Sequence, residues 1–462
     1  MRRYIILSIL VIVLILSIFF ILRKPELNEL FPEYVDLKDS EWFGIYLKNN
    51  KVGYNVSNID TLKDGYVVRS FTYMKINPVS GMEKDVSYEI TANTDTLQNL
   101  KNFTFRMNSE KYRFYAEGRK EGKKLIIEYT SGKQKNRIEK ELSIDEIPAT
   151  LEAIVSTGRT GEFEYFDPTT QSLMKIKIDY KGEDYYNGIR VKKYSVSMVG
   201  IEIDFLLDEE GKLLKEESPI GLTLLKEDKK NAMKIEGIQE GLYDSYSIKT
   251  NTIIRNPRDV KRLKVRIKDV DLSGLKIIDS RQKIKKDILE IKKTFPMNNF
   301  TIPDSIKKFT LPEEFIPSDA EIIIKKAKEI TGNLEGWEKV QSINRWVFEN
   351  LKKKPSFTIP DPIEVLSSLE GDCNEHSALF VALARASGIP AKVEVGIVYF
   401  GDAFYYHAWA SVWFGQWVSV DPTFGQEIAD ATHIKLEEGG FENQVKLYKV
   451  INKLKIEILE YD

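Results

Sequence analysis

The chain has 462 residues, which exceeds the size of one ordinary domain and predicts two or three domains. Its 42% hydrophobic and 30% charged residues are typical of a folded protein and exclude disorder throughout the chain. The 68 basic and 70 acidic residues leave a net charge of -2, so long-range electrostatics gives no support for nucleic acid as a partner. A single cysteine excludes an internal disulfide framework and zinc sites built on cysteine pairs.

An apolar segment opens the chain. Tyr4 to Leu22 contains only two serine interruptions, and basic residues flank it on both sides. This length is enough for a helix to cross a bilayer. The alternative is a cleaved signal peptide, but the segment ends in large residues instead of a small-residue cleavage site. We therefore predict a transmembrane anchor at residues 1–24 and a single-pass membrane protein. The positive-inside rule slightly favours a body outside the cytoplasm.

The region from residue 25 to residue 251 is β-rich. Apolar β-branched and aromatic residues alternate there with polar residues, which predicts an antiparallel sheet domain. Turn residues at Asn49-Asn50 and at 208–211 predict two of its hairpins. The one predicted helix runs from Ile147 to Thr157. Lysines at the polar positions of these strands are typical of a solvated face, and no residues here resemble a catalytic set.

Residues 252–316 are interpreted as a connecting module. Its basic stretch from Arg281 to Lys293 has helical character. The last domain is predicted at 317–462, where Ser318 is a suitable N-cap for a helix over residues 319–331.

Two further helices are predicted before the cysteine. Apolar residues at helical spacing predict a buried helix from Trp337 to Leu351. Asp361 and Pro362 suit the N-cap and first turn of a short helix, which we expect Gly371 to end.

The cysteine itself lies at the start of another predicted helix. Asp372 and Glu375 have the spacing of a capping box, with Asp in place of Ser or Thr, and Gly388 followed by Pro390 ends the helix. Cys373 thus occupies the first turn, where backbone N–H groups and the helix dipole can lower a cysteine pKa by about one unit or more. The alternative interpretation is a buried, inert cysteine.

Three strands are predicted after this helix, at residues 391–400, 403–414 and 417–421. His407 lies in the second strand and Asp421 ends the third. A thiol nucleophile needs a base to take its proton, and that base needs an acceptor that fixes its tautomer. The cysteine, the histidine and the aspartate are candidates for these three roles.

Strand parity restricts how the histidine and the aspartate can meet, because side chains alternate between the two faces of a sheet. A two-residue turn at Gly415-Gln416 would leave them on opposite faces. If Trp413 opposes Trp417 instead, they become diagonal neighbours on one face. We therefore predict a three-residue loop, Phe414-Gly415-Gln416, or an equivalent bulge near the glycine.

These residues resemble the transglutaminase-like core that transglutaminases share with many microbial proteins. The resemblance spans about Ser318 to about Ile434 and is carried by Glu370-Gly371-Asp372-Cys373, by residues 384–391, by Tyr406-His407-Ala408-Trp409 and by residues 417–423. It implies that Cys373 is the nucleophile, that His407 is the general base and acid, and that Asp421 orients the imidazole.

The resemblance also implies a papain-like arrangement, in which a helix with the cysteine packs on an antiparallel sheet with the histidine and the aspartate. The predicted fold class is therefore α+β, with an N-terminal transmembrane helix, a β-rich antiparallel domain and a C-terminal transglutaminase-like α+β domain. One feature departs from animal transglutaminases, which use an indole ahead of the cysteine as an oxyanion donor. The comparable position falls near Ile359 or Pro360, so that donor is missing.

The predicted function is that of a membrane-anchored thiol enzyme that cleaves or transfers at an amide or acyl bond through a Cys373 thioester. Peptidase or amidase activity is favoured over acyl transfer to an amine, a peptide or protein is the expected substrate, and no cofactor or metal is expected. The alternative function is a non-catalytic, membrane-bound binding or scaffold protein that retains the fold. A metal site of Cys373, His376, His407 and Asp421 is a further alternative. His433 matches a recurrent stretch of the family, and its default interpretation is structural.

Overall fold

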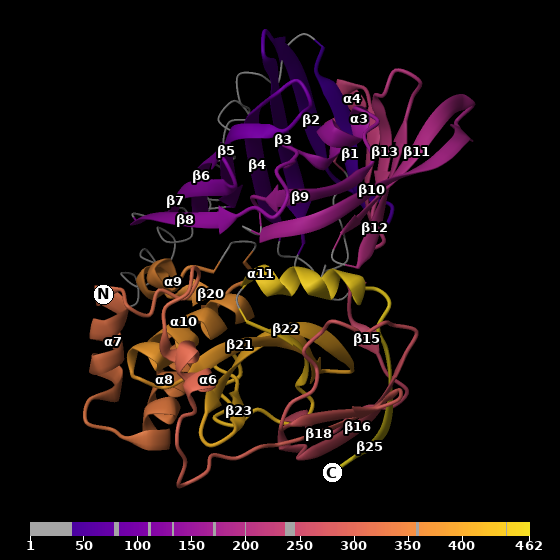
Figure 1. The fold of residues 1–462 in the computed structure, drawn as a ribbon. Helices are drawn as coiled ribbons and strands as arrows, with labels where there is room; N and C mark the ends of the chain where they lie inside the picture. The colour runs from indigo at the N-terminus through magenta and orange to yellow at the C-terminus, as the bar shows by residue number, and fades with distance from the viewer. Residues whose placement is uncertain are drawn as a thin grey trace, which may run out of the picture.

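A computed structural model describes residues 39–77, 83–109, 112–131, 134–169, 172–198, 200–235, 245–356, 360–439 and 441–462 (Figure 1). The first fourteen strands form an upper body together with α3 and α4, and the other helices and three smaller sheets form a lower body. The predicted transmembrane helix at residues 1–24 lies outside these ranges. Within them no helix is long and apolar enough to cross a membrane, so the transmembrane part of the predicted fold class has no support.

The upper body is one fourteen-stranded antiparallel sheet, which confirms the predicted sheet. Strands pair with their neighbours in the chain, except that β1 pairs with β14 and joins the two halves. The strands are β1 (Glu41–Leu47), β2 (Asn50–Leu62), β3 (Gly65–Ile76), β4 (Lys84–Thr94), β5 (Leu100–Ser109), β6 (Tyr112–Glu121), β7 (Lys124–Ser131), β8 (Gln134–Glu141), β9 (Gly161–Asp167), β10 (Ser172–Tyr186), β11 (Ile189–Met198), β12 (Ile201–Leu207), β13 (Leu213–Glu217) and β14 (Leu222–Glu227). Two short helices accompany them, α3 (Leu151–Ser156) and α4 (Lys229–Ala232).

This sheet buries alternate residues. On β5, Phe103, Phe105 and Met107 are buried, and the residues between them are more exposed. Such a period of two places one face of the sheet on a core and the other in solvent. The alternation that predicted these strands is therefore a consequence of one-sided burial.

The lower body is built around α10 (Cys373–Ala386), which packs on β22 and against three other helices. Its main sheet has the order β15-β22-β21-β24, with β23 paired to β22, and a second sheet has the order β17-β18-β16-β25. The strands are β15 (Ile248–Lys249), β16 (Arg262–Lys268), β17 (Gln282–Lys285), β18 (Ile288–Lys292), β19 (Lys352–Lys353), β20 (Glu370–Gly371), β21 (Ala391–Phe400), β22 (Ala403–Trp413), β23 (Trp417–Val420), β24 (Ile434–Glu438) and β25 (Lys455–Tyr461). The remaining helices are η2 (Pro257–Asp259), α6 (Asp304–Lys307), η3 (Lys308–Thr310), α7 (Glu321–Thr331), α8 (Gly336–Asn350), α9 (Pro362–Ser368), α11 (Phe441–Gln444) and η4 (Val445–Lys449).

The segment interpreted as a connecting module packs within the lower body. Its strand β16 pairs with β25 near the C-terminal end of the chain. Leu263 and Leu289 of this segment belong to the same hydrophobic core as Leu379 of α10 and Ile458 of β25. Residues on both sides of the catalytic region in sequence therefore contribute to one core.

The predicted α+β fold class is wrong for the chain as a whole. Among the residues that the structure describes, strands hold 48% and helices 19%, so the fold is mostly β. The prediction relied on the helices around the cysteine, but more residues lie in the fourteen-stranded sheet and in the strands of the lower body than in helices.

Three local predictions also need correction. The stretch from Arg281 to Lys293 is not helical but forms the hairpin of β17 and β18, because Leu289 and Ile291 are buried at a spacing of two. The helix predicted from residue 319 begins at Glu321, so Ser318 is not its cap. The helix α9 ends at Ser368, and the C-cap residue that follows it, Leu369, has a φ of 53° and supplies the left-handed conformation expected at Gly371.

Candidate active site

Cys373 is the first residue of α10. The Asp372 carboxylate accepts the N–H of Asn374 at 2.8 Å, and the Glu375 carboxylate accepts the N–H of Asp372 at 2.9 Å. This arrangement confirms the predicted capping box and fixes the residue at which the helix begins. The Cys373 N–H belongs to the first turn and has no acceptor within the helix.

The surroundings of Cys373 favour the neutral thiol. Burial and the nearby Asp372 carboxylate raise the pKa of the Cys373 thiol well above its usual range, and the backbone N–H of Ala408 opposes this rise only in part. Burial and the neighbouring Glu375 in turn raise the pKa of Asp372. The expected lowering of the cysteine pKa by the helix start is therefore wrong for the resting site. The thiol needs a base to become a nucleophile.

The hairpin of β22 and β23 confirms the predicted register. Trp413 opposes Trp417, and the N–H of Phe414 donates to the carbonyl of Gln416 at 2.9 Å across a three-residue loop. Gly415 has a φ of 75°, which a glycine adopts without strain. The loop therefore turns the histidine of β22 and the aspartate after β23 toward the same face.

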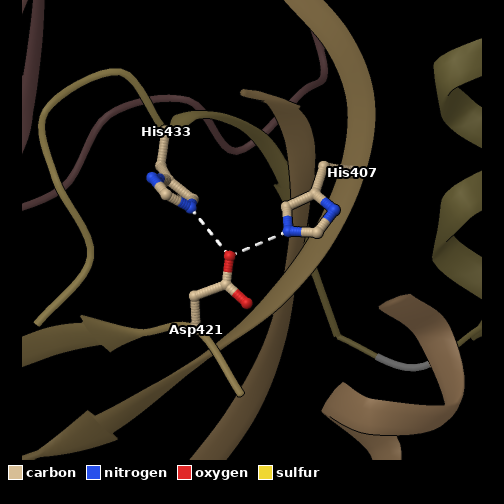
Figure 2. A group of neighbouring side chains, drawn as sticks. All are labelled: His407, Asp421 and His433. Atoms are coloured by element: carbon tan, nitrogen blue, oxygen red, sulfur yellow. Dashed lines mark hydrogen bonds and ion pairs between the residues drawn. The ribbon is translucent and has the colours of Figure 1, made fainter. Parts of the chain in front are cut away.

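His407 and Asp421 are in direct contact (Figure 2). His407 Nε2 lies 2.9 Å from Asp421 Oδ2, and Asp421 Oδ1 accepts the N–H groups of Thr423 and Phe424 at 2.7 and 3.0 Å. The Phe424 ring stacks on the His407 ring at 4.9 Å between centroids. Although burial opposes a charged carboxylate, His407 and His433 hold the pKa of Asp421 well below its usual range.

This contact sets the tautomer of His407. An ionised carboxylate only accepts hydrogen bonds, so the proton of a neutral His407 must sit on Nε2. The other ring nitrogen, Nδ1, then carries a lone pair and is the basic atom. Cys373 lies beside the same strand, because α10 packs on β22 and the N–H of Ala408 faces the Cys373 sulfur. The basic atom Nδ1 therefore belongs to His407, the residue just before Ala408, whose N–H faces the Cys373 sulfur.

The sequence analysis named His433, the second histidine of this cluster, but gave it no role in the site. His433 Nε2 lies 3.0 Å from the same Asp421 oxygen, on the other side of the carboxylate (Figure 2). The sequence analysis did not single out its partner Asp430 or Arg258, the arginine paired with Asp430. The chain has three histidines, and this scarcity together with the Asp430 to His433 stretch was the available signal.

His376, by contrast, does not join the cluster. Its Nδ1 lies 2.6 Å from the carbonyl oxygen of Asp372, one turn earlier on the helix, and burial lowers the pKa of His376. Within the described ranges, the residues that could each offer a metal-ligand atom within 4.8 Å of the others are His407, Asp421 and His433. Shared hydrogen bonds to Asp421 account for this grouping, and we assign no metal to it.

One family comparison covers the catalytic region. Residues 324–422 match the model of the transglutaminase-like superfamily, so this part of the chain is a transglutaminase-like domain. Cys373, His407 and Asp421 fall inside the match, whereas Arg258, Asp430 and His433 fall outside it. No curated protein sequence matches the chain.

Three solved structures are similar at low identity. A putative cysteine protease from Cytophaga hutchinsonii is 15% identical, with a TM-score of 0.29 over 44% of this chain and 89% of that one. A β-barrel-like protein from Brucella abortus with a domain of unknown function is 12% identical, with a TM-score of 0.32 over 41% and 94%. A putative protease from Parabacteroides distasonis is 14% identical, with a TM-score of 0.20 over 68% and 67%. TM-scores this low do not establish a shared fold over the whole chain.

Proposed function

We propose that the chain is a thiol hydrolase that cleaves an amide or acyl bond through a thioester on Cys373. His407 serves as general base and then general acid, and Asp421 orients the His407 ring. A peptide or protein is the proposed substrate class. The transglutaminase-like match of residues 324–422 supports a thiol enzyme at the level of the family.

The observation that carries this proposal is the contact between His407 Nε2 and Asp421 Oδ2 at 2.9 Å. It leaves Nδ1 as the basic atom of a ring that lies on the strand against which the cysteine helix packs. A neutral thiol, a neutral imidazole and an oriented carboxylate are the parts that general-base thiol catalysis requires.

The first half of the reaction forms the thioester. The Cys373 proton passes to His407 Nδ1 while the sulfur bonds to the substrate carbonyl carbon, and the carbonyl oxygen takes the electron pair. The Cys373 N–H at the helix start is the proposed oxyanion donor. When the tetrahedral intermediate collapses, the bond from carbon to the leaving group breaks and the leaving group takes the proton from His407.

The second half returns the enzyme to its resting state. Water gives a proton to His407 as its oxygen bonds to the thioester carbon, the carbon–sulfur bond breaks, and the sulfur recovers the proton. Water is favoured over an amine as the acceptor because no second substrate site is assigned and only one oxyanion donor is identified.

Trapping of an acyl-enzyme tests this function. The protein is incubated with libraries of peptide amides and esters, quenched in acid, and the adduct is identified by mass on the peptide that contains Cys373. We expect an acyl adduct in wild type, none in Cys373→Ala, and a loss of at least about 100-fold in the rate of adduct formation in His407→Ala.

The chain offers a simple control because it has one cysteine, so every thiol adduct reports on the same residue. If peptides bind to the protein but no acyl adduct forms in wild type with any library member, the hydrolase proposal fails and the binding or scaffold alternative gains support.

A further inference from the structure

His433 is a buried ring between two carboxylates. Its side chain has no exposed surface, its Nε2 lies 3.0 Å from Asp421 Oδ2, and its Nδ1 lies 3.4 Å from Asp430 Oδ2. The first contact is a hydrogen bond, and the second is an ion-pair contact of looser geometry. A histidine with a carboxylate at each nitrogen is stabilised with protons on both.

Asp430 is itself held in place as an anion. Its Oδ1 accepts from the N–H and the hydroxyl of Thr432 at 2.7 and 2.5 Å, and Arg258 Nη1 lies 2.9 Å from its Oδ2. Arg258 also donates to the carbonyl of Tyr399, and its guanidinium lies 4.8 Å from the Phe424 ring centroid. These contacts lead from Arg258, through Asp430 and His433, to Asp421 and the catalytic histidine.

The charges of the four residues linked by these contacts balance when His433 is protonated. Asp421 and Asp430 supply two negative charges, and Arg258 and a protonated His433 supply two positive charges. Burial opposes the charged forms, but the Asp430 and Asp421 carboxylates raise the pKa of His433, and His433 with Arg258 lowers the pKa of Asp430.

Other elements bring few additional charges to this ring. Trp409 of β22 packs edge-on against it at 5.2 Å, and Phe424 lies at 6.2 Å. Arg281 Nη1 donates to the His433 carbonyl at 2.7 Å, on the backbone side of the residue. The titratable or charged groups around the ring are Asp421, Asp430, His407, Arg258, Arg281 and, through its field on Asp430, Lys293.

We propose that His433 is a positioning residue, a buried imidazolium that offsets the Asp421 charge, so that Asp421 orients His407 while His407 remains neutral and basic at Nδ1. This inference rests on the proposed thiol chemistry and deepens it. A lone aspartate beside His407 would favour the imidazolium and with it a preformed thiolate. With His433 in place, the resting pair is a neutral thiol and a neutral imidazole.

Nitrogen NMR of the full chain labelled with ¹⁵N-histidine tests the charge state directly. Three histidines give three pairs of ring signals, which His376→Gln and His433→Gln assign by loss. We expect one ring, that of His433, to titrate at a higher pH than an ordinary histidine, and the ring of His407, in its neutral form, to carry its proton on Nε2. A His433 ring that titrates at or below the pH of an ordinary histidine, about 6.5, would overturn the inference without bearing on acyl-enzyme formation.

The pH profile of Cys373 alkylation by iodoacetamide tests the consequence. In His433→Gln an amide can still donate to Asp421, but the positive charge is gone. We expect the midpoint of the alkylation profile to move down by about one pH unit, because the uncompensated Asp421 now favours the imidazolium–thiolate pair. The matched control is His376→Gln, which removes the other buried histidine and should leave the midpoint in place.

A second variant keeps the test decisive if His433→Gln fails to fold. Asp430→Asn retains the ring but removes one of its carboxylates, and we expect the His433 signals to titrate at lower pH than in wild type. An unchanged alkylation midpoint in folded His433→Gln, or equal shifts in His433→Gln and His376→Gln, would contradict the positioning role. If wild type also forms no acyl-enzyme, the proposed function fails separately, and the NMR result still decides the charge of His433.

Discussion

Two ion pairs, one in each body of the protein, lie in opposite surroundings. In the upper sheet, ion pairs such as Lys193 with Asp204 lie on the solvated face, where the two side chains are 38% and 43% exposed. In the lower body, Asp421 and His433 pair with no exposed surface at all. Exposed pairs contribute little to stability, but a buried charge that loses its partner is costly.

The difference follows from how each sheet is covered. Strand β5 of the upper sheet alternates between buried and exposed residues, whereas nine of the ten residues of β21 are buried. A strand covered on both faces has nowhere to place a charge except in the core, so Glu394 there accepts from Trp409 and Ser419, each at 2.7 Å. Ionisable groups kept in such a core at a cost in stability mark a functional region.

The largest effect should come from breaking a buried pair and comparing it with an exposed one. Asp421→Asn removes the acceptor charge shared by two histidines, and we expect it to lower the free energy of unfolding by roughly 3–5 kcal/mol. The same substitution in the upper sheet, Asp204→Asn, should change it by less than about 0.5 kcal/mol. Urea titration of both variants measures the difference. Equal destabilisation would mean that the two bodies do not differ in the way their charges are held.

The helix start and the strand register of the catalytic region could be predicted from the sequence because several local signals agree. The capping box, the helix from Cys373 and the strand register at Trp413 and Trp417 each follow from nearest-neighbour rules, and each is confirmed. Strand parity, together with the requirement that the histidine and the aspartate meet, predicted the three-residue loop that puts them on one face. These features depend on residues close together in the chain.

The remainder of the site depends on contacts between distant residues. Arg258 lies 172 positions before its partner Asp430. No local sequence pattern connects Arg258, in the segment interpreted as a connecting module, with Asp430, in the loop before β24. His433 likewise gives no periodic signal, because its loop belongs to neither a helix nor a strand. The helix wrongly expected at Arg281 to Lys293 has a different cause, because the two-residue alternation that reveals the strands is local but was obscured by the basic residues there.

As the pH is lowered, the lower body should lose stability at a higher pH than the upper body. Burial opposes ionisation of Glu438, but Lys392 and Lys435 lower the pKa of Glu438 to about 2 from its usual 4.5. A lowered folded-state pKa gives stability that is complete above pH 4.5 and is lost as the pH falls toward 2. The lowered pKa of Glu438 contributes on the order of 3 kcal/mol to the free energy of unfolding above pH 4.5. Asp421 and Asp430 act in the same direction.

Tryptophan fluorescence can separate the two bodies in this titration. Five of the six tryptophans lie in the lower body, and only Trp42 lies in the upper sheet. We expect fluorescence to change at a higher pH than the β-sheet circular dichroism. Glu438→Gln should be less stable than wild type at pH 7 and lose less stability between pH 4.5 and pH 2. A single transition that both signals share and that Glu438→Gln leaves unchanged would contradict this prediction.

The smallest effect should come from paired turn glycines, one in each body. Gly188 forms the two-residue turn between β10 and β11 with a φ of 80°, and Gly415 lies in the loop before β23 with a φ of 75°. A Cβ at Gly188 meets no described atom within 4 Å, whereas one at Gly415 would lie 2.6 Å from the Met297 sulfur. Both substitutions impose backbone strain, but only the second also displaces a packed neighbour.

We expect Gly188→Ala to lower the free energy of unfolding by about 1 kcal/mol, from the left-handed backbone alone. Gly415→Ala should lower it by about 2 kcal/mol, because Met297 must also move. The more informative readout is chemical. Since the Gly415 loop sets the register that brings Asp421 to His407, Gly415→Ala should also alter the pH profile of Cys373 alkylation, and Gly188→Ala should not. If Gly415→Ala lowers stability but leaves that profile unchanged, the contact between His407 and Asp421 does not depend on the loop, and the sheet on both sides of the hairpin must hold the register by itself.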